Sequence, residues 1–121
     1  MNIKGGCYCG EIRYESKGEV QASIQCHCRE CQYITGGNAN VLMIMPISGF
    51  QFVSGKPQEF QRIDLEKAVT RLFCGKCGTA IGTRSPMRPE SIILKVGTFD
   101  DPSVFDPEIA IFTIDKQKFH H

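Results

Sequence analysis

The sequence predicts a mainly β protein, and three observations support that fold class. Short segments rich in β-branched and aromatic residues recur along the chain, glycine and proline interrupt them at short intervals, and helical patterns are scarce. Hydrophobic residues make up 41% of the 121 residues and charged residues 22%, a composition typical of folded globular proteins. We therefore expect one domain that spans residues 1–121.

The expected elements follow from local patterns, taken in chain order. Ile12 and Tyr14 alternate with polar neighbours, as do Val20, Ala22 and Ile24, so each group can bury one face of a strand. The longest apolar run lies in the strand expected at 39–45, and a proline ends it. Further strands are expected at residues 50–53, 69–73, 91–96 and 109–114. Residues 28–33 could form one helical turn, and residues 64–68 could form a turn of helix or a loop.

The charge balance and the distribution of apolar residues narrow the expected class of protein. The 14 basic and 13 acidic residues nearly cancel, whereas a nucleic-acid partner usually requires a strong basic excess. The first ten residues contain no apolar run typical of a signal peptide, and no segment approaches the ~18 apolar residues of a membrane span. We expect a cytoplasmic protein without a membrane partner. In that reducing compartment an odd number of cysteines indicates metal binding or catalysis rather than disulfides.

All seven cysteines fall into three groups. They form a C-x-C pair (Cys7, Cys9), a C-x-C-x-x-C group (Cys26, Cys28, Cys31) and a C-x-x-C pair (Cys74, Cys77). A C-x-C pair in extended chain places both sulfurs on one face, because side chains alternate with period two. A C-x-x-C turn directs its two sulfurs toward one point. Both patterns are therefore suited to holding one metal ion.

Zinc chemistry suggests how these cysteines are divided. A structural zinc has four protein ligands, and a catalytic zinc has three and an open position. The two pairs can close a four-cysteine structural site between distant parts of the chain, which leaves a three-cysteine group. That group could bind zinc with a position open to a soft ligand such as a substrate thiolate. Alternatively, His27 could complete a closed site, or the three thiols could be free.

Four motifs together resemble one known family. They are Gly6-Cys7-Tyr8-Cys9-Gly10, Cys26-His27-Cys28-x-x-Cys31, Phe73-Cys74-x-x-Cys77-Gly78 and Gly97-Thr98-Phe99-Asp100-Asp101-Pro102. In this order and spacing they resemble the GFA family, named for the glutathione-dependent formaldehyde-activating enzyme, S-(hydroxymethyl)glutathione synthase. The family also includes the centromere protein V-like proteins. The resemblance extends from residue 6 to about residue 119.

This resemblance implies a Mss4-like fold of packed antiparallel β-sheets around two zinc ions per chain. It implies a structural zinc at one cysteine set (Cys7, Cys9, Cys74, Cys77) and an active-site zinc at the other, catalytic set (Cys26, Cys28, Cys31). The implied function is that of a carbon–sulfur lyase acting on a glutathione-like thiol and a small aldehyde such as formaldehyde. Two alternatives are a non-catalytic zinc module that binds a protein partner and a thiol or zinc sensor. An oligomer is possible in each case.

A few other residues have two interpretations each. Asp100 and Asp101 could be an acid pair, but Asp-Asp-Pro is typical of a turn. His27 could act as a general base or fix its loop. Arg29 and Arg84 could bind a substrate carboxylate or be ordinary exposed charges. The glycines at positions 36 and 37 could admit a ligand to the backbone amides or only make a turn.

Overall fold

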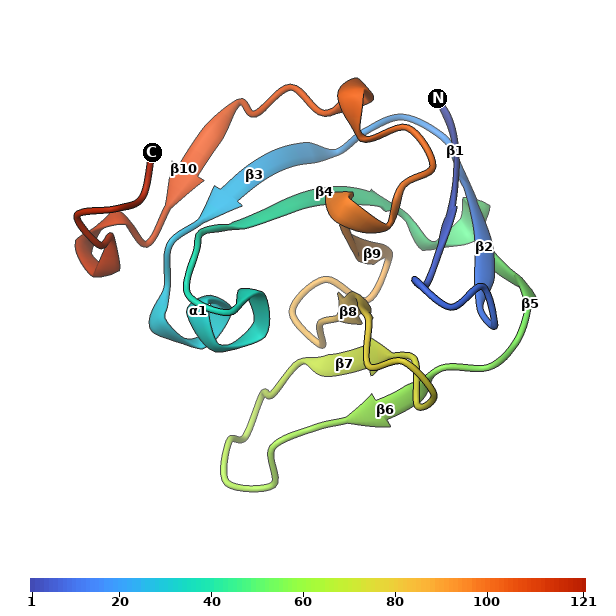
Figure 1. Ribbon diagram of the computed structural model, residues 1–121, viewed down its shortest axis with the longest axis horizontal. Coiled ribbons are helices and arrows are strands. Elements are labelled where there is room, and N and C mark those ends of the chain that lie inside the picture. The colour runs from blue at the N-terminus through green and yellow to red at the C-terminus, as the bar shows by residue number, and fades with distance from the viewer.

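The computed structural model describes residues 1–121 and has a mainly β fold, as predicted. Its strands form a three-stranded and a seven-stranded sheet (Figure 1). In order across the sheet, the small one contains β1 (Asn2–Gly6), β2 (Arg13–Lys17) and β5 (Phe50–Ser54). The large one contains β10 (Ile109–Ile111), β3 (Ala22–Cys26), β4 (Asn40–Pro46), β9 (Ser91–Lys95), β8 (Ala80–Arg84), β7 (Thr70–Phe73) and β6 (Gln58–Phe60).

The remaining elements are one α-helix and four short 3-10 turns. Helix α1 spans Arg29–Thr35, and the 3-10 turns are η1 (Ile47–Gly49), η2 (Val96–Thr98), η3 (Pro102–Val104) and η4 (Thr113–Asp115). No helix in the structure is long and apolar enough to cross a membrane. The expected turn at residues 28–33 is thus a longer helix, and residues 64–68 form a loop with a turn rather than a helix.

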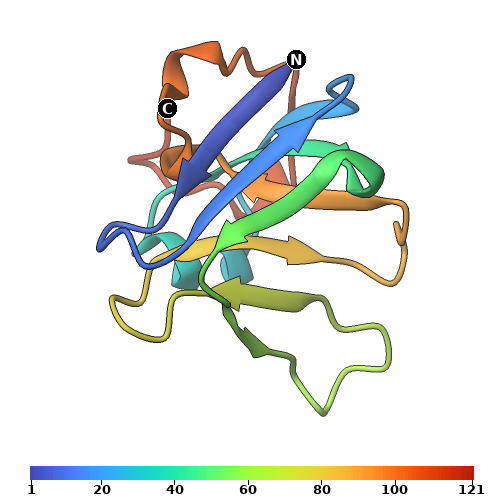
Figure 2. The same cartoon turned by 90° about the vertical axis from the view of Figure 1, so that its right-hand side faces the viewer.

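The core lies between the two sheets. Figure 2 shows the three strands of the small sheet, from blue to green, crossing in front of the large sheet. Tyr14 of β2 is fully buried there, and Met43 and Met45 of β4 reach the same core together with their partners on β9, Leu94 and Ile92. Side chains on a strand alternate between faces. The intervening residues of β4 therefore face away from this core.

Helix α1 covers that second face of the large sheet. Asn40 of β4 donates a hydrogen bond to the sulfur of Cys31 on α1. The helix starts after Cys28, whose sulfur accepts the backbone N–H of Cys31 at 3.2 Å, and it ends at Gly36 with φ 82°. Glycine suits this left-handed end because it has no Cβ. The start of the helix therefore brings the sulfurs of Cys28 and Cys31 together and places the Cys31 sulfur against β4.

The strand predictions were correct for most segments and missed three. Strands β1, β6 and β8 were not predicted: β1 and β8 contain glycine, and β6 has three exposed residues, so none shows a clear apolar alternation. The strand expected at 109–114 ends at Ile111, because Phe112 adopts a left-handed φ of 53°. Pairing is antiparallel throughout except that β10 lies parallel to β3. The sheets are therefore antiparallel, as expected, apart from this one edge.

Candidate functional site

Four cysteine sulfurs from distant parts of the chain meet at one point. Cys7 and Cys9 lie in the turn after β1, and Cys74 and Cys77 lie in the turn between β7 and β8. All four sulfurs lie within 4.8 Å of one another, with Cys7 and Cys9 at 3.6 Å and Cys9 and Cys74 at 3.8 Å. Zinc–sulfur bonds of ~2.3 Å in a tetrahedron require sulfurs ~3.8 Å apart. The cluster therefore fits a zinc ion, whereas a disulfide requires about 2.05 Å.

The two turns in this cluster each supply a backbone N–H to a sulfur, and each contains a left-handed glycine. The N–H of Ile12 donates to the Cys7 sulfur at 3.2 Å, and the N–H of Cys77 donates to the Cys74 sulfur at 3.4 Å. Gly10 and Gly78 follow the second cysteine of each turn with φ of 83° and 80°, a conformation that glycine adopts without strain. Such amide donors stabilise thiolates and fix their direction toward a metal.

Thr79 links the two turns and favours the thiolate form of Cys77. The Thr79 hydroxyl lies 3.1 Å from the Cys77 sulfur and accepts the backbone N–H of Tyr8 at 3.1 Å. Hydrogen bonds from the Thr79 hydroxyl and backbone lower the pKa of Cys77 to about 5. The anionic form that a metal requires is thus favoured by this chain's own donors.

The other three cysteines form a second cluster at the start of α1. Cys26 ends β3, Cys28 caps the helix and Cys31 lies in its first turn, and the three sulfurs lie within 4.8 Å of one another. Cys26 and Cys31 are buried, and Cys28 is half-buried. The Asn40 amide donates to the Cys31 sulfur at 3.5 Å. Three sulfurs converge here, and no other His, Cys, Asp or Glu ligand atom joins them.

The three thiols of this cluster differ in acidity. Hydrogen bonding from Cys26, followed by that from Asn40 and Cys28, lowers the pKa of Cys31 to about 5 despite its burial. The bond to Cys31 and burial raise the pKa of Cys26. Burial likewise raises the pKa of Cys28. Cys31 is therefore the thiol that ionises first, and a bound cation would favour the thiolate at the other two.

His27 does not complete this cluster, because its ring contacts the C-terminal segment instead. The Gln117 N–H donates to His120 Nδ1 at 3.2 Å and His120 Nε2 lies 2.8 Å from the Gly37 carbonyl oxygen. His120 Nδ1 is therefore an acceptor, and the buried His27 donates to it from Nδ1 at 3.0 Å. Gln32 adds a bond to the His27 carbonyl oxygen at 2.9 Å. These contacts favour the interpretation that His27 fixes its loop.

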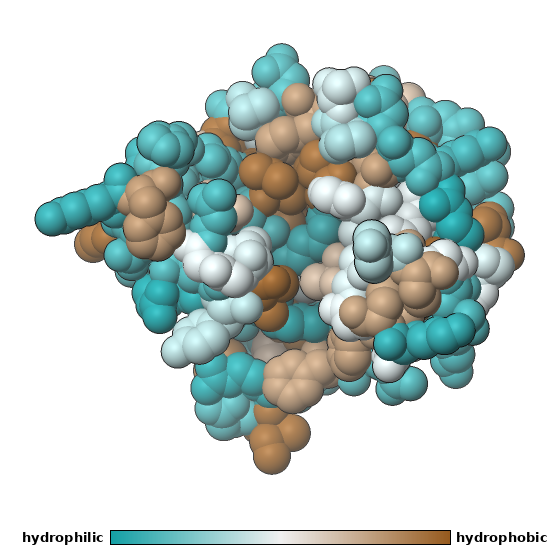
Figure 3. All heavy atoms as spheres, in the orientation of Figure 1, coloured by the Kyte–Doolittle hydropathy of each residue, from teal (hydrophilic) through white to brown (hydrophobic).

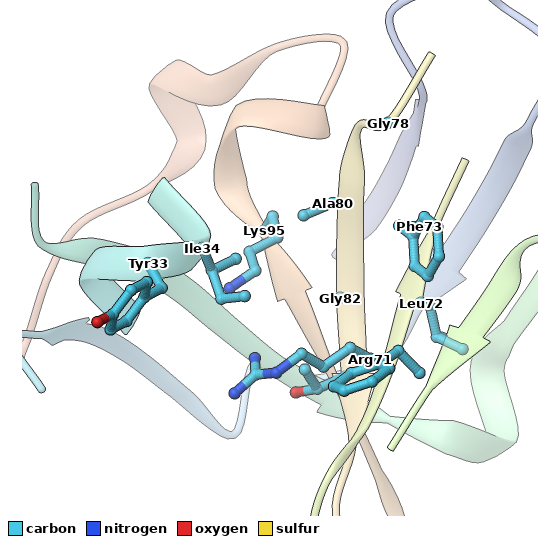
Figure 4. A pocket seen from close by; sticks show the side chains of 11 residues that line it. Tyr33, Ile34, Arg71, Leu72, Phe73, Gly78, Ala80, Gly82 and Lys95 are labelled. Atoms are coloured by element: carbon cyan, nitrogen blue, oxygen red, sulfur yellow. The ribbon is translucent and has the colours of Figure 1, made fainter. Parts of the chain in front are cut away.

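A cavity of about 360 Å³ opens between α1 and strands β7 and β8. Figure 3 shows this face of the molecule hollowed near its centre. Apolar and aromatic side chains form part of the wall, as the close view in Figure 4 shows for Tyr33 and Ile34 of α1. Lys95 also lines this cavity, and it lines an adjoining one of about 300 Å³ that contains Asn40.

Two cations belong to the cavity. Arg71 forms an ion pair with Glu30 of α1. Lys95 is 9% exposed, and burial lowers its pKa to about 8, opposed in part by the nearby Cys31 thiolate. No sequence motif marks Asn40, Thr79, Lys95 or His120 as a site residue. For Lys95 alone the sequence offers a signal, since it is a lysine at the end of the mainly apolar strand β9.

The arginines proposed as carboxylate ligands have partners within the chain. Arg29 donates to the Gln32 side chain and stacks over the Tyr33 ring at 5.3 Å, and Arg84 pairs with Glu59 at 2.9 Å. Both arginines are thus engaged on the protein surface. These contacts agree with the interpretation that both are ordinary exposed charges.

The acidic pair and the two glycines have structural contacts of the kind expected for turns. Asp100 accepts two hydrogen bonds from Arg13, and Asp101 accepts the Ser103 N–H at 3.1 Å at the start of η3. The N–H groups of Gly36 and Gly37 both bond the carbonyl oxygen of Gln32 at the end of α1. These amides are occupied and do not face a ligand.

The fold and site define a mainly β protein with two cysteine centres, each able to hold a metal ion. The model of the GFA family, described as glutathione-dependent formaldehyde-activating enzyme, matches residues 2–115. The chain therefore belongs to the GFA family. A protein from Rhodobacter sphaeroides of known crystal structure has a similar fold, with a TM-score of 0.69, 18% identity, and coverage of 88% of this chain and 98% of that one. No protein with a curated description matches the chain.

Proposed function

We propose that this protein is a zinc-dependent carbon–sulfur lyase that joins a glutathione-like thiol to a small aldehyde such as formaldehyde, and reverses that reaction. The observation that carries the proposal is the division of seven sulfurs into a set of four and a set of three. Four thiolates complete the coordination of a structural zinc, whereas three leave one position for a substrate. Membership of the GFA family supports the same chemistry.

The cluster of Cys26, Cys28 and Cys31 is the proposed catalytic centre. Zinc held there would lower the pKa of a substrate thiol, which makes the nucleophilic thiolate available near neutral pH. In the net reaction a carbon–sulfur bond forms at the aldehyde carbon, and the proton lost by the thiol ends on the aldehyde oxygen. The reverse reaction breaks that bond and returns the proton to sulfur.

The chain's own groups hold this centre in a defined geometry. The Cys31 N–H bonds the Cys28 sulfur, and the Asn40 amide bonds the Cys31 sulfur, so each donor reduces the negative charge on one sulfur. Cys28 is the half-buried member and lies on the accessible side. The cavity between α1 and β7 is large enough for a small organic substrate.

The four-cysteine cluster is proposed to be structural. It ties the turn after β1 to the turn after β7, two segments of different sheets. A metal bound there links the sheets in the folded state only, because the unfolded chain separates these turns. The four sulfurs would fill the coordination sphere of a tetrahedral zinc, so no position would remain for substrate.

Exchange spectroscopy tests the proposal. Formaldehyde and glutathione combine without help, so NMR should follow the rate of interconversion between free thiol and S-(hydroxymethyl)glutathione. Zinc-loaded protein should accelerate this exchange when present far below the substrate concentration. The variant Cys28→Ser should lose the acceleration, whereas Cys77→Ser should keep it if circular dichroism shows the fold intact.

Cobalt substitution gives a readout that does not depend on turnover. Added glutathione should change the visible spectrum of one cobalt centre and leave the other unchanged, because only the three-cysteine centre has a free position. The change should be absent in Cys28→Ser. A spectrum indifferent to thiol, together with no acceleration of exchange, would refute the proposal and favour a non-catalytic module or a sensor.

A further inference from the structure

Lys95 is a buried cation whose ammonium group has no partner in the protein. The residue is 9% exposed, and its Nζ makes neither an ion pair nor a hydrogen bond. Burial of most of the side chain disfavours the charged form of a lysine unless an anion compensates it. Figure 4 shows its nitrogen directed into the space between α1 and the strands that carry Arg71 and Gly82. The side chain therefore presents an unused positive charge to a cavity.

Strand register places Lys95 on the same face of the large sheet as the three-cysteine centre. Lys95 of β9 pairs with Leu42 of β4, and two residues along β4, Asn40 pairs with Cys26. Residues directly opposite, and residues two apart on one strand, share a face. Lys95, Asn40 and Cys26 thus project to the side covered by α1.

The local charges leave Lys95 available for an anion. Asn40 connects Lys95 to the cysteine centre, since it lines a cavity together with Lys95 and bonds the Cys31 sulfur, and a Cys31 thiolate opposes the lowering of the Lys95 pKa by burial. The carboxylate of Glu30 is taken by Arg71, which itself adds positive charge beside Lys95. The cavity wall thus contains the unpaired ammonium of Lys95 and the guanidinium of Arg71, and the three-cysteine centre lies beside it. Such a site is suited to a molecule that carries both a thiol and an anionic group.

We propose that Lys95 forms a carboxylate-binding subsite, which selects thiol substrates that carry a carboxylate while their sulfur enters the three-cysteine centre. This inference rests on the proposed function and adds to it the residue that recognises the carboxylate of such a thiol. The backbone of Lys95 is held in place because the Thr98 hydroxyl donates to its carbonyl oxygen at 2.7 Å. The ammonium is therefore presented from a fixed point at the end of β9.

A simpler role for Lys95 would be to balance the negative charge of three thiolates. That role predicts the same effect on every thiol, charged or neutral. A carboxylate subsite predicts instead a difference between two thiols that are alike except for the carboxylate. The ratio of their affinities separates the two roles, because any general effect on the metal centre cancels in it.

Isothermal titration calorimetry of the zinc-loaded protein measures that ratio at pH 7. The two ligands are 3-mercaptopropionate and its neutral amide, 3-mercaptopropionamide. Wild-type protein should bind the carboxylate at least ~10-fold more tightly than the amide, as expected for a hydrogen bond between charged groups. In Lys95→Met the ratio should fall close to one, and Lys95→Arg should retain most of it. Lys56→Met, which removes an exposed lysine without an ion pair, should leave it unchanged.

Each outcome decides a separate claim. Equal affinities in wild-type protein, or a ratio that survives in Lys95→Met, would overturn the subsite and leave the proposed function standing. Equal weakening of both thiols in Lys95→Met would assign the residue to charge balance and overturn the subsite. If neither thiol binds wild-type protein, the proposed function fails and the subsite fails with it. Lys95→Gln serves as a second variant where Lys95→Met does not retain zinc.

Discussion

A chain of two buried hydrogen bonds connects the core to the cavity, and its removal has a calculable cost. The Tyr14 hydroxyl lies 2.6 Å from the Thr98 hydroxyl oxygen, and the Thr98 hydroxyl donates to the Lys95 carbonyl oxygen at 2.7 Å. Thr98 has one hydroxyl hydrogen, which is used for Lys95, so Tyr14 is the donor to Thr98. Tyr14 is fully buried, and burial raises its pKa to about 12.

The substitution Tyr14→Phe should lower the free energy of unfolding by about 1–2 kcal/mol. It removes one hydrogen bond and leaves the buried Thr98 oxygen without its donor, and a buried hydrogen bond between neutral groups contributes about that much. Thr98→Val should lower the free energy of unfolding more, by about 1–3 kcal/mol, because it leaves the buried Tyr14 hydroxyl without an acceptor. Since both variants break the same bond, the double variant should cost less than the sum of the two.

Urea denaturation at a fixed, saturating zinc concentration measures these values, because bound metal adds to stability by mass action. Tyr33→Phe is the matched control: Tyr33 is 79% exposed and should change stability by less than ~0.5 kcal/mol. A loss below ~0.5 kcal/mol for Tyr14→Phe, or additive losses in the double variant, would refute the chain of bonds described here.

Three further predictions concern other contacts. Gly55→Ala should destabilise the fold by more than ~1 kcal/mol, because φ is 73° and the new Cβ would lie 2.2 Å from a backbone carbonyl oxygen; Gly97→Ala, which meets no atom within 4 Å, should be nearly neutral in the same urea measurement. Arg13 lowers the pKa of Asp100, so their pair stabilises the fold above pH ~4 and this contribution is lost as pH falls through the lowered pKa. Arg13→Met should therefore cost less than ~1 kcal/mol at pH 7, since both groups are partly exposed, and nothing in acid; a cost independent of pH would contradict this. His120→Ala removes a bond of 2.8 Å to a backbone carbonyl oxygen, so amide hydrogen exchange should become faster around residues 27–37 and remain unchanged in β1.

Sequence spacing was sufficient to predict which sulfurs lie together. C-x-C and C-x-x-C patterns fix the direction of neighbouring sulfurs, so the sets of four and three followed from counting, and the structure brings the same sulfurs together. Strands with apolar alternation, such as β3 and β4, were also predictable. The glycine-containing β1 and β8 were not, because their residues show no period that distinguishes strand from loop.

The groups around the second cluster depend on register and could not be predicted. Asn40 and Lys95 reach the cysteine centre only because β4 pairs with both β3 and β9 at particular residues. His120 meets His27 from 93 positions away in the chain. The sequence left two interpretations open for Arg29 and Arg84, a substrate carboxylate ligand or an ordinary exposed charge. Their partners, Gln32 and Glu59, become visible only in three dimensions.

The most direct test of the account is the amount and coordination of zinc in the purified chain. Native mass spectrometry should find two zinc ions in wild-type protein and one in Cys28→Ser. X-ray absorption should give about 3.5 sulfur neighbours per zinc without added thiol, because seven cysteines divide between two ions, and about 4 after a thiol is added. A single zinc per chain, or a sulfur–sulfur bond among the seven cysteines, would contradict the division into a closed and an open centre.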